Sequence, residues 1–223
     1  PASRSVTVNG ADATGMDFAA TAMIWTLRSI PNTLKSIAWS GTRFVAVGDA
    51  MILTSLDGIT WTPKPQPYGT NLEQVIWAGN RFIAVGGATL FTSPDGLSWT
   101  PHNSGATAVL RAVAWSGTKI VAVGASSVAA GLGMIVASND AITWTSQSTT
   151  QSLTAIAWSQ ALAKFVAVGH NGSIVSSPDG VAWTPQTSGT ANVLMGIAWS
   201  GSQFVIAGFS GTILHSSDGT NWT

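Results

Sequence analysis

The chain has 223 residues, of which only 8% are charged, and nine lysine and arginine residues balance nine aspartate and glutamate residues. This balance argues against nucleic-acid binding, which needs a basic surface, and against a polybasic membrane anchor. The absence of cysteine excludes disulfides, thiolate zinc sites and a cysteine nucleophile. A 45% apolar content with eleven tryptophans indicates a folded core. No apolar stretch is long enough for a membrane span, so no membrane insertion is expected.

The N-terminal segment, residues 1–33, does not share the repeat found in the rest of the chain. Its sequence SVTV at residues 5–8, NGAD at 9–12 and GMDFAAT at 15–21 resembles the end of a carboxypeptidase-regulatory-like or immunoglobulin-like domain of bacterial surface proteins. Met23–Thr26, MIWT, matches the last strand of a repeat. This segment has two possible roles. It closes the ring of repeated units that makes up the rest of the chain, as an added strand or a partial sixth blade, or it adds a strand to a neighbouring molecule. The candidate assembly residues are Val6, Val8, Phe18 and Trp25.

From residue 34 onward, one unit occurs five times, and each unit opens on a leucine followed by a tryptophan, as in LKSIAWSG from Leu34. The first tryptophans of successive units are 38, 38, 43 and 41 residues apart. A period near 40 is typical of propeller blades or of helical solenoids. After each tryptophan comes a short β-branched run bounded by glycine, such as RFVAVG, which favours a buried strand over a helix. Each unit therefore predicts four short antiparallel strands.

Five such units can bury both apolar faces only by packing one sheet against the next, which predicts an all-β fold, a β-propeller of five recognisable blades. The expected blades span about 34–71, 72–109, 110–152, 153–193 and 194–223. Large flat side chains suit the wedge between blades, so tryptophan is assigned to inter-blade packing. The residues concerned are Trp39, Trp61, Trp77, Trp99, Trp115, Trp144, Trp158, Trp183, Trp199 and Trp222.

An aspartate stands four positions before the second tryptophan of every unit, in sequences such as SLDGITW and SPDGVAW. Its carboxylate can accept backbone N–H bonds within its own turn, and the glycine that follows can adopt positive φ. In the third unit, Ala141 replaces this glycine, which suggests a strained or different turn. The five residues assigned as structural Asp-turns are Asp57, Asp95, Asp140, Asp179 and Asp218.

These turns resemble the Asp-box, or bacterial neuraminidase repeat, of sialidase-like and photosystem II assembly-factor-like propellers. In those families the Asp-box is a peripheral structural element, so the resemblance implies a folding role for Asp57 and its equivalents. It also implies that a sialidase would need an arginine cluster, a tyrosine nucleophile with a partnering glutamate, and an acidic aspartate. This chain has a single tyrosine, Tyr68, and a single glutamate, Glu73. A glycoside hydrolase is therefore disfavoured, and no catalytic residue is assigned.

Two surfaces are candidates for binding. Polar loops between units, rich in Ser, Thr, Asn and Gln, suit a sugar but are equally typical of solvated turns; the candidate ligand-face residues are Asp49, Tyr68, His102 and His170. On the opposite face of the propeller, the residue that opens the second strand is basic in four of the five units. These residues either form a ring of positive charge that binds an anion or form ion pairs with the Asp-turns. That position holds Arg43, Arg81, Lys119, Lys164 and then Gln203.

No histidine pair has metal-binding spacing, so neither a metal nor another cofactor is expected. The sequence predicts a non-catalytic interaction or structural module of an extracellular or cell-surface protein, with a signal peptide outside this chain. Its expected partners are copies of itself or other surface domains, and strand exchange would allow filaments. The alternative is a lectin-like propeller that binds glycans. Residues 34–223 are expected to form the propeller, and residues 1–33 the strand segment.

Overall fold

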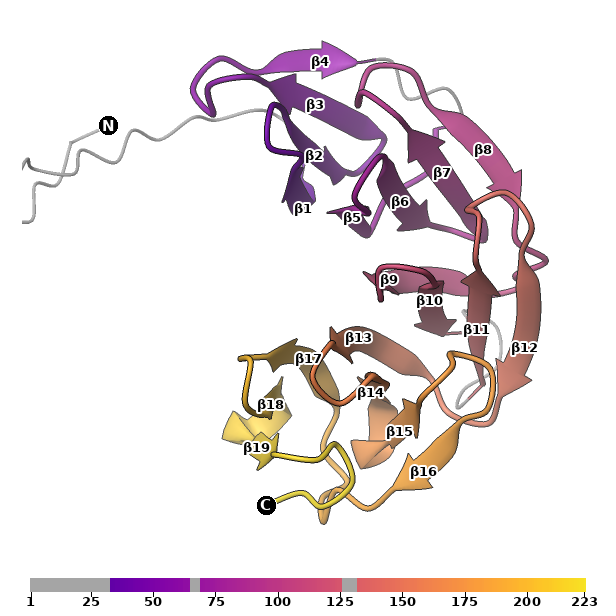
Figure 1. Cartoon of the computed structure of the whole chain (residues 1–223), viewed down its shortest axis with the longest axis vertical. Coiled ribbons are helices and arrows are strands. Elements are labelled where there is room, and N and C mark those ends of the chain that lie inside the picture. Colours follow the sequence, from indigo (N-terminus) through magenta and orange to yellow (C-terminus); the bar gives the residue numbers. More distant parts are fainter. Residues whose placement is uncertain (1–32, 65–68, 126–131) are drawn as a thin grey trace, which may run out of the picture. The chain divides into compact units, whose positions relative to one another are not determined.

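A computed structural model describes residues 33–64, 69–125 and 132–223, and it divides the chain into two units, Pro1–Pro31 and Asn32–Thr223. The first unit lies outside the described residues. The second consists of antiparallel sheets that follow one another in chain order (Figure 1), here called blades 1 to 5. The all-β propeller architecture predicted from the repeat is thereby confirmed.

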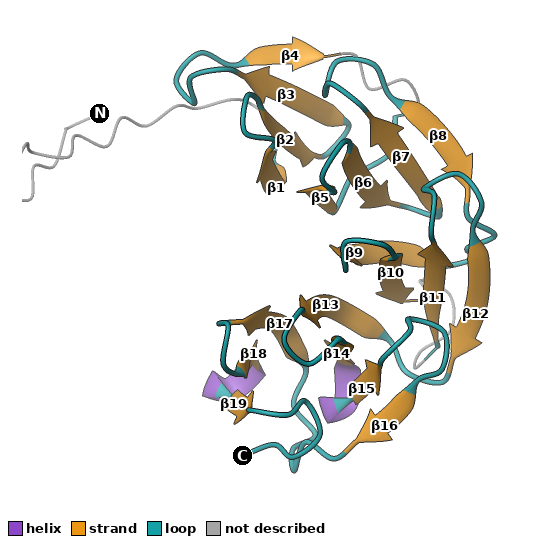
Figure 2. Ribbon diagram, viewed as in Figure 1, coloured by secondary structure: helices purple, strands orange, loops and turns teal. Residues whose placement is uncertain are grey.

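Blades 1 to 4 each contain four antiparallel strands in chain order (Figure 2), and the second and third strands of these blades are the most deeply buried. Blade 1 comprises β1 (Leu34–Trp39), β2 (Phe44–Gly48), β3 (Met51–Ser55) and β4 (Thr62–Lys64). Blade 2 comprises β5 (Gln74–Trp77), β6 (Phe82–Gly86), β7 (Thr89–Ser93) and β8 (Thr100–Asn103). Blade 3 comprises β9 (Val109–Trp115), β10 (Ile120–Ala125), β11 (Gly133–Ser138) and β12 (Thr145–Thr149). Blade 4 comprises β13 (Leu153–Ser159), β14 (Lys164–Gly169), β15 (Ile174–Ser177) and β16 (Thr184–Gln186).

Blade 5 has three strands in the described chain, β17 (Leu194–Trp199), β18 (Phe204–Gly208) and β19 (Ile213–Ser216), where four were expected. Thr223 occupies the position at which the fourth strand begins in the other blades, and it exchanges two backbone hydrogen bonds with His215. Only the first residue pair of a fourth strand is therefore formed here. Two short 3-10 turns, His170–Gly172 and Phe209–Gly211, join the second and third strands of blades 4 and 5.

The core lies between successive blades rather than within one sheet, because both faces of each middle strand are apolar. In FVAVG and its equivalents, alternate side chains point to the preceding and the following blade. At the first junction, Val45, Val47 and Ile52 of blade 1 pack against Leu72 and Val75 of blade 2. Three further clusters repeat this arrangement at the other junctions. Each blade thus has a leading face, directed toward the preceding blade, and a trailing face, directed toward the following one.

Aromatic rings fill the wide end of each blade. In blade 1, Trp39 lies 4.2 Å from Phe44 between ring centroids, and Phe44 lies 6.2 Å from Trp61. Blades 2, 4 and 5 contain the same group of two tryptophans around one phenylalanine. Blade 3 differs because Ile120 stands at the position of the phenylalanine. The group of three rings is therefore absent from blade 3.

Candidate functional site

The Asp-turns share one bonding pattern, which explains why the aspartate recurs. The Ser55 hydroxyl donates to Asp57 Oδ1 at 2.9 Å, and the backbone N–H groups of Ile59 and Thr60 donate to the same oxygen at 2.8 and 2.7 Å. The other four turns repeat these bonds. Ala141 keeps the turn of its neighbours, at φ 64°, a conformation that costs a residue with a Cβ about 1 kcal/mol. In every turn the Oδ1 atom of the aspartate therefore accepts three hydrogen bonds from within the turn.

These bonds stabilise the ionised carboxylates. The backbone N–H of Thr60, together with that of Ile59, lowers the pKa of Asp57 to about 2. Backbone N–H bonds are also the largest cause of the lowered pKa of Asp140, Asp179 and Asp218. For Asp95, burial raises the pKa, but the hydrogen bonds that its carboxylate accepts together outweigh this effect, so the pKa of Asp95 is lowered as well. All five groups bind protons more readily in the unfolded chain than in the folded one.

We expect the protein to lose stability in acid for this reason. A lowered folded-state pKa adds stability that is present above the unfolded pKa of about 3.9 and disappears as the pH falls toward about 2. The urea concentration at the unfolding midpoint can be followed by near-ultraviolet circular dichroism. These five groups should leave it constant between about pH 5 and pH 7, and they should lower it once the pH drops under about 4. Because the partners are backbone N–H groups, added salt should not restore it. A midpoint that is unchanged down to about pH 2.5 would contradict this account.

The basic residue at the start of each second strand reaches forward to the Asp-turn of the following blade. Lys164 Nζ donates to the backbone oxygen of Asp218 at 2.7 Å, and Arg81 Nη1 lies 3.4 Å from that of Asp140. The expected ion pairs with the turns are therefore replaced, at these two junctions, by bonds to main-chain carbonyls. Each Asp-turn carboxylate is already satisfied by N–H groups, whereas its carbonyl projects toward the preceding blade. These contacts account for the basic position without an anion ring.

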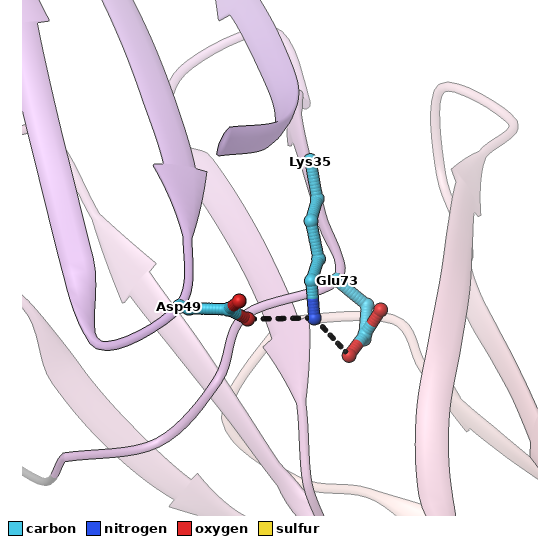
Figure 3. Close-up of polar contacts among 3 residues, drawn as sticks. All are labelled: Lys35, Asp49 and Glu73. Atoms are coloured by element: carbon cyan, nitrogen blue, oxygen red, sulfur yellow. Dashed lines mark hydrogen bonds and ion pairs between the residues drawn. The ribbon is translucent and has the colours of Figure 1, made fainter. Parts of the chain in front are cut away.

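One ion-paired group joins blades 1 and 2 (Figure 3). Lys35 Nζ lies 2.8 Å from Asp49 Oδ1 and 2.9 Å from Glu73 Oε1. Lys35 is the extra residue of a β-bulge between β1 and β2, which turns its side chain toward the neighbouring blade. The hydrogen bond that Lys35 donates to Asp49, followed by the one that it donates to Glu73, raises the pKa of Lys35. The only glutamate of the chain is thus engaged with a lysine.

The residues of the predicted ligand face are not brought together. Asp49 and His170 occupy the same turn position in blades 1 and 4, far apart in the series of blades. His102 lies on the outer strand β8, hydrogen-bonded to Thr92 at 2.8 Å, and burial lowers its pKa. Tyr68 lies outside the described residues, as do Val6, Val8, Phe18 and Trp25.

A cavity of about 550 Å³ lies at the junction of blades 2 and 3, on the side of the Asp-turns. Its walls come from four blade 2 residues, Ala78 to Arg81, and from blade 3 residues that include Trp115, Ile120 and Asp140. Sequence reasoning did not assign this site. The signal was nevertheless present, because blade 3 departs from the repeat both at Ile120 and at Ala141. No group of His, Asp or Glu residues suited to a metal ion occurs in the described ranges.

Two apolar faces are exposed at the ends of the series. On the leading face of blade 1, Leu34 is 40% and Ile37 57% exposed, whereas the equivalent Leu72 and Val75 of blade 2 are 1% and 2% exposed. On the trailing face of blade 5, Ile213 is 68% exposed, while its equivalents in blades 1 to 4 are at most 1% exposed; these are Ile52, Leu90, Ile135 and Ile174. Among the described residues, no blade packs on either face, although both carry the side chains of a blade junction.

Solved structures with the same fold were found, although no protein-family model and no curated protein sequence matches the chain. YCF48 bound to D1 peptide is 17% identical with a TM-score of 0.66, over 91% of this chain and 69% of that chain. YCF48 from Cyanidioschyzon merolae is 17% identical with a TM-score of 0.65, over 89% and 74%. A chain of the nidogen/laminin complex is 9% identical with a TM-score of 0.64, over 83% and 76%.

At these identities the likeness establishes the fold alone. The β-propeller in the predicted resemblance is therefore confirmed, while the Asp-box family and the resemblance of residues 1–20 to surface domains stay predictions. Among the described residues, no helix is both long and apolar enough to cross a bilayer.

Proposed function

We propose that this chain is a non-catalytic β-propeller module that binds proteins at the cell surface or outside the cell. The pair of exposed apolar blade faces carries the proposal. Apolar patches of this kind on a folded protein mark contact sites. Two similar folds come from structures with a bound partner, YCF48 with D1 peptide and the nidogen/laminin complex, which supports protein binding here. The pairing of Glu73 with Lys35 supports a module without glutamate-dependent hydrolysis.

A second copy of the chain is the proposed occupant of these faces. At four junctions within the chain, a leading face already packs on a trailing face. The exposed leading face of blade 1 and the exposed trailing face of blade 5 carry the same kinds of side chain. Their contact would join copies head to tail, a heterologous interface that extends into a filament unless it closes into a ring. The residues proposed as a donated strand, Val6, Val8, Phe18 and Trp25, would add to the same contact, because β19 is the last strand of a three-stranded sheet.

Light scattering after size exclusion tests the assembly, with the full chain at several concentrations. We expect wild type to form species larger than 22.9 kDa whose share grows with concentration. The variants Ile37→Lys and Ile213→Lys each replace an exposed apolar side chain that the proposed contact would bury, and each should weaken association by at least about tenfold. Ile59→Lys is the matched control, because Ile59 is 59% exposed on an Asp-turn that belongs to neither face.

The outcomes separate face packing from strand exchange. A chain without residues 1–33 should still assemble if the faces drive association, and should become monomeric if a donated strand does. Wild type that stays at 22.9 kDa at every concentration would refute self-assembly. Equal weakening by Ile59→Lys would show that the two faces have no special role.

Lectin-like carbohydrate binding is a second candidate function, and the cavity at the junction of blades 2 and 3 favours it. The cavity presents an indole, two amides and a hydroxyl at one place in the fold, whereas the loop residues predicted as a ligand face lie apart.

A further inference from the structure

The cavity between blades 2 and 3 arises from one departure from the repeat. In blades 1, 2, 4 and 5, the first tryptophan rests on a phenylalanine of the next strand, with ring centroids 4.2 to 4.7 Å apart. In blade 3 that strand carries Ile120, which has no ring to offer. Trp115 instead lies against the preceding blade, where a Cβ placed on Gly79 would be 2.6 Å from its Cη2 atom. The equivalent Gly41, Gly117 and Gly201 have no atom within 4 Å of such a Cβ.

Two features of this arrangement favour a ligand. Trp115 is half-buried and forms a wall of the cavity, where its indole packs closely against the backbone of Gly79. The volume of about 550 Å³ falls within the range of about 300 to 1,000 Å³ that is usual for small-molecule sites. Ile120 is 5% exposed, so the floor of the cavity is apolar while its rim is polar.

The rim of the cavity carries polar side chains that can donate and accept hydrogen bonds. Asn80 and Asn139 supply amides, and Thr118 supplies a hydroxyl. Arg81 donates through Nε to Asn80 Oδ1 at 3.2 Å and through Nη1 to the Asp140 backbone oxygen at 3.4 Å, which uses two of its five N–H donors and fixes the guanidinium at the edge. Asp140 lines the same cavity, so the positive charge of Arg81 is matched by one negative charge. This balance disfavours a strongly charged ligand.

We infer that this cavity is a carbohydrate-binding site that takes a neutral sugar. Sugars present an apolar face of C–H groups, which packs on an aromatic ring, and a rim of hydroxyls that both donate and accept hydrogen bonds. Trp115 meets the first requirement, and Asn80 with Asn139 meets the second. A peptide would fit the apolar floor, but it would form fewer hydrogen bonds than a sugar with the two asparagine amides and the threonine hydroxyl of the rim. The inference is independent of the self-assembly proposed above, because the cavity lies away from both exposed blade faces.

Sister blades supply the variants that test the site. Ile120→Phe restores the residue found in the other four blades, so it should draw Trp115 back onto its own blade and fill the cavity without unfolding the protein. Asn80→Thr and Asn139→Ser likewise install residues that blades 1 and 5 carry at the same positions. Pro178→Ser is the control, since it changes the equivalent turn position of blade 4, outside the cavity.

The measurement is saturation-transfer NMR with cellobiose, maltose, lactose and N,N′-diacetylchitobiose as probes, with an acidic sugar and a peptide library alongside. At least one neutral disaccharide should bind wild type with a dissociation constant on the order of 1 mM. Ile120→Phe and Asn139→Ser should each weaken that binding by about tenfold or more, and Pro178→Ser should leave it unchanged. Near-ultraviolet circular dichroism confirms that each variant is folded.

Several results would overturn the inference. The first is that no neutral probe binds the wild-type protein. The second is that a sugar binds wild type and Ile120→Phe equally, which would place it elsewhere. The third is that peptides bind and Ile120→Phe displaces them while no sugar binds, which would show a peptide site. Self-assembly is measured separately, with Ile37→Lys and Ile213→Lys. A negative result for sugar binding therefore does not affect the test of self-assembly, and the reverse also holds.

Discussion

Replacement of Gly169 by alanine is expected to destabilise the protein by about 3 kcal/mol or more, enough to unfold blade 4. Gly169 ends β14 at the point where the chain enters β13 from the preceding loop. A Cβ at this position would lie 1.9 Å from the backbone oxygen of Ser152 and 2.9 Å from Leu153 Cα. Neither atom belongs to a flexible side chain, so the two strands would have to separate. Leu153 is fully buried there, and its packing would be lost as well.

Gly196→Ala is the matched comparison for this change. Gly196 also lies in a strand, but no atom stands within 4 Å of its ideal Cβ and its φ is not in the left-handed region. Alanine should therefore be tolerated there, with a gain of up to about 0.5 kcal/mol from reduced chain entropy. Urea unfolding of both variants measures the difference. Equal losses would contradict the close approach of backbone as the reason for glycine at position 169.

Truncation of Phe165 to alanine is the second change with a large expected effect, a loss of about 3 to 5 kcal/mol. Phe165 is 1% exposed, and its ring lies 4.4 Å from Trp158 and 6.5 Å from Trp183 between centroids. Its removal would leave a void at the wide end of blade 4 and deprive both indoles of their partner. The urea midpoint should fall, and the near-ultraviolet circular dichroism of the folded state should weaken because the ring contacts contribute to it.

Phe165→Ile separates the loss of volume from the loss of the ring. Isoleucine is the residue that blade 3 carries at this position, where Ile120 is 5% exposed in a formed sheet. It should cost less than alanine, since it refills most of the void, while the aromatic circular dichroism should fall as much as with alanine. If alanine cost no more than isoleucine, the explanation by cavity formation would be wrong.

The strands were predictable because each repeat carries its own local signals. The glycine at the end of each second strand and the serine before each Asp-turn bound the strands by their backbone and side-chain chemistry. Both signals can be recognised in a single unit, and they recur in all five units. The same signals predicted a fourth strand in blade 5, of which the described chain shows only the pair of Thr223 with His215. Pairing of that strand depends on residues beyond a local turn.

The binding surfaces were less predictable from the sequence, because they depend on which residues of another blade pack against a given side chain. Leu34 and Leu72 have the same local sequence context, and yet one is exposed and the other buried according to whether a blade packs on them. Lys164 was expected to meet a carboxylate, but the carboxylate of Asp218 is already satisfied within its turn, so the lysine binds its carbonyl. His102 was assigned to a loop face and lies on a strand. The departures from the repeat at Ile120 and Ala141 were the only sequence signals of the cavity.

The likeness of the four junctions bears on how such a chain can change through evolution. The four junctions pair the same kind of trailing face with the same kind of leading face, and at two of them a basic residue, Arg81 or Lys164, reaches the Asp-turn of the following blade. In-frame duplication or loss of one whole unit would therefore create no new kind of interface. Blade number can drift without redesign of any contact, whereas an insertion that breaks a unit would damage two junctions. Selection on such a gene would act on whole repeats.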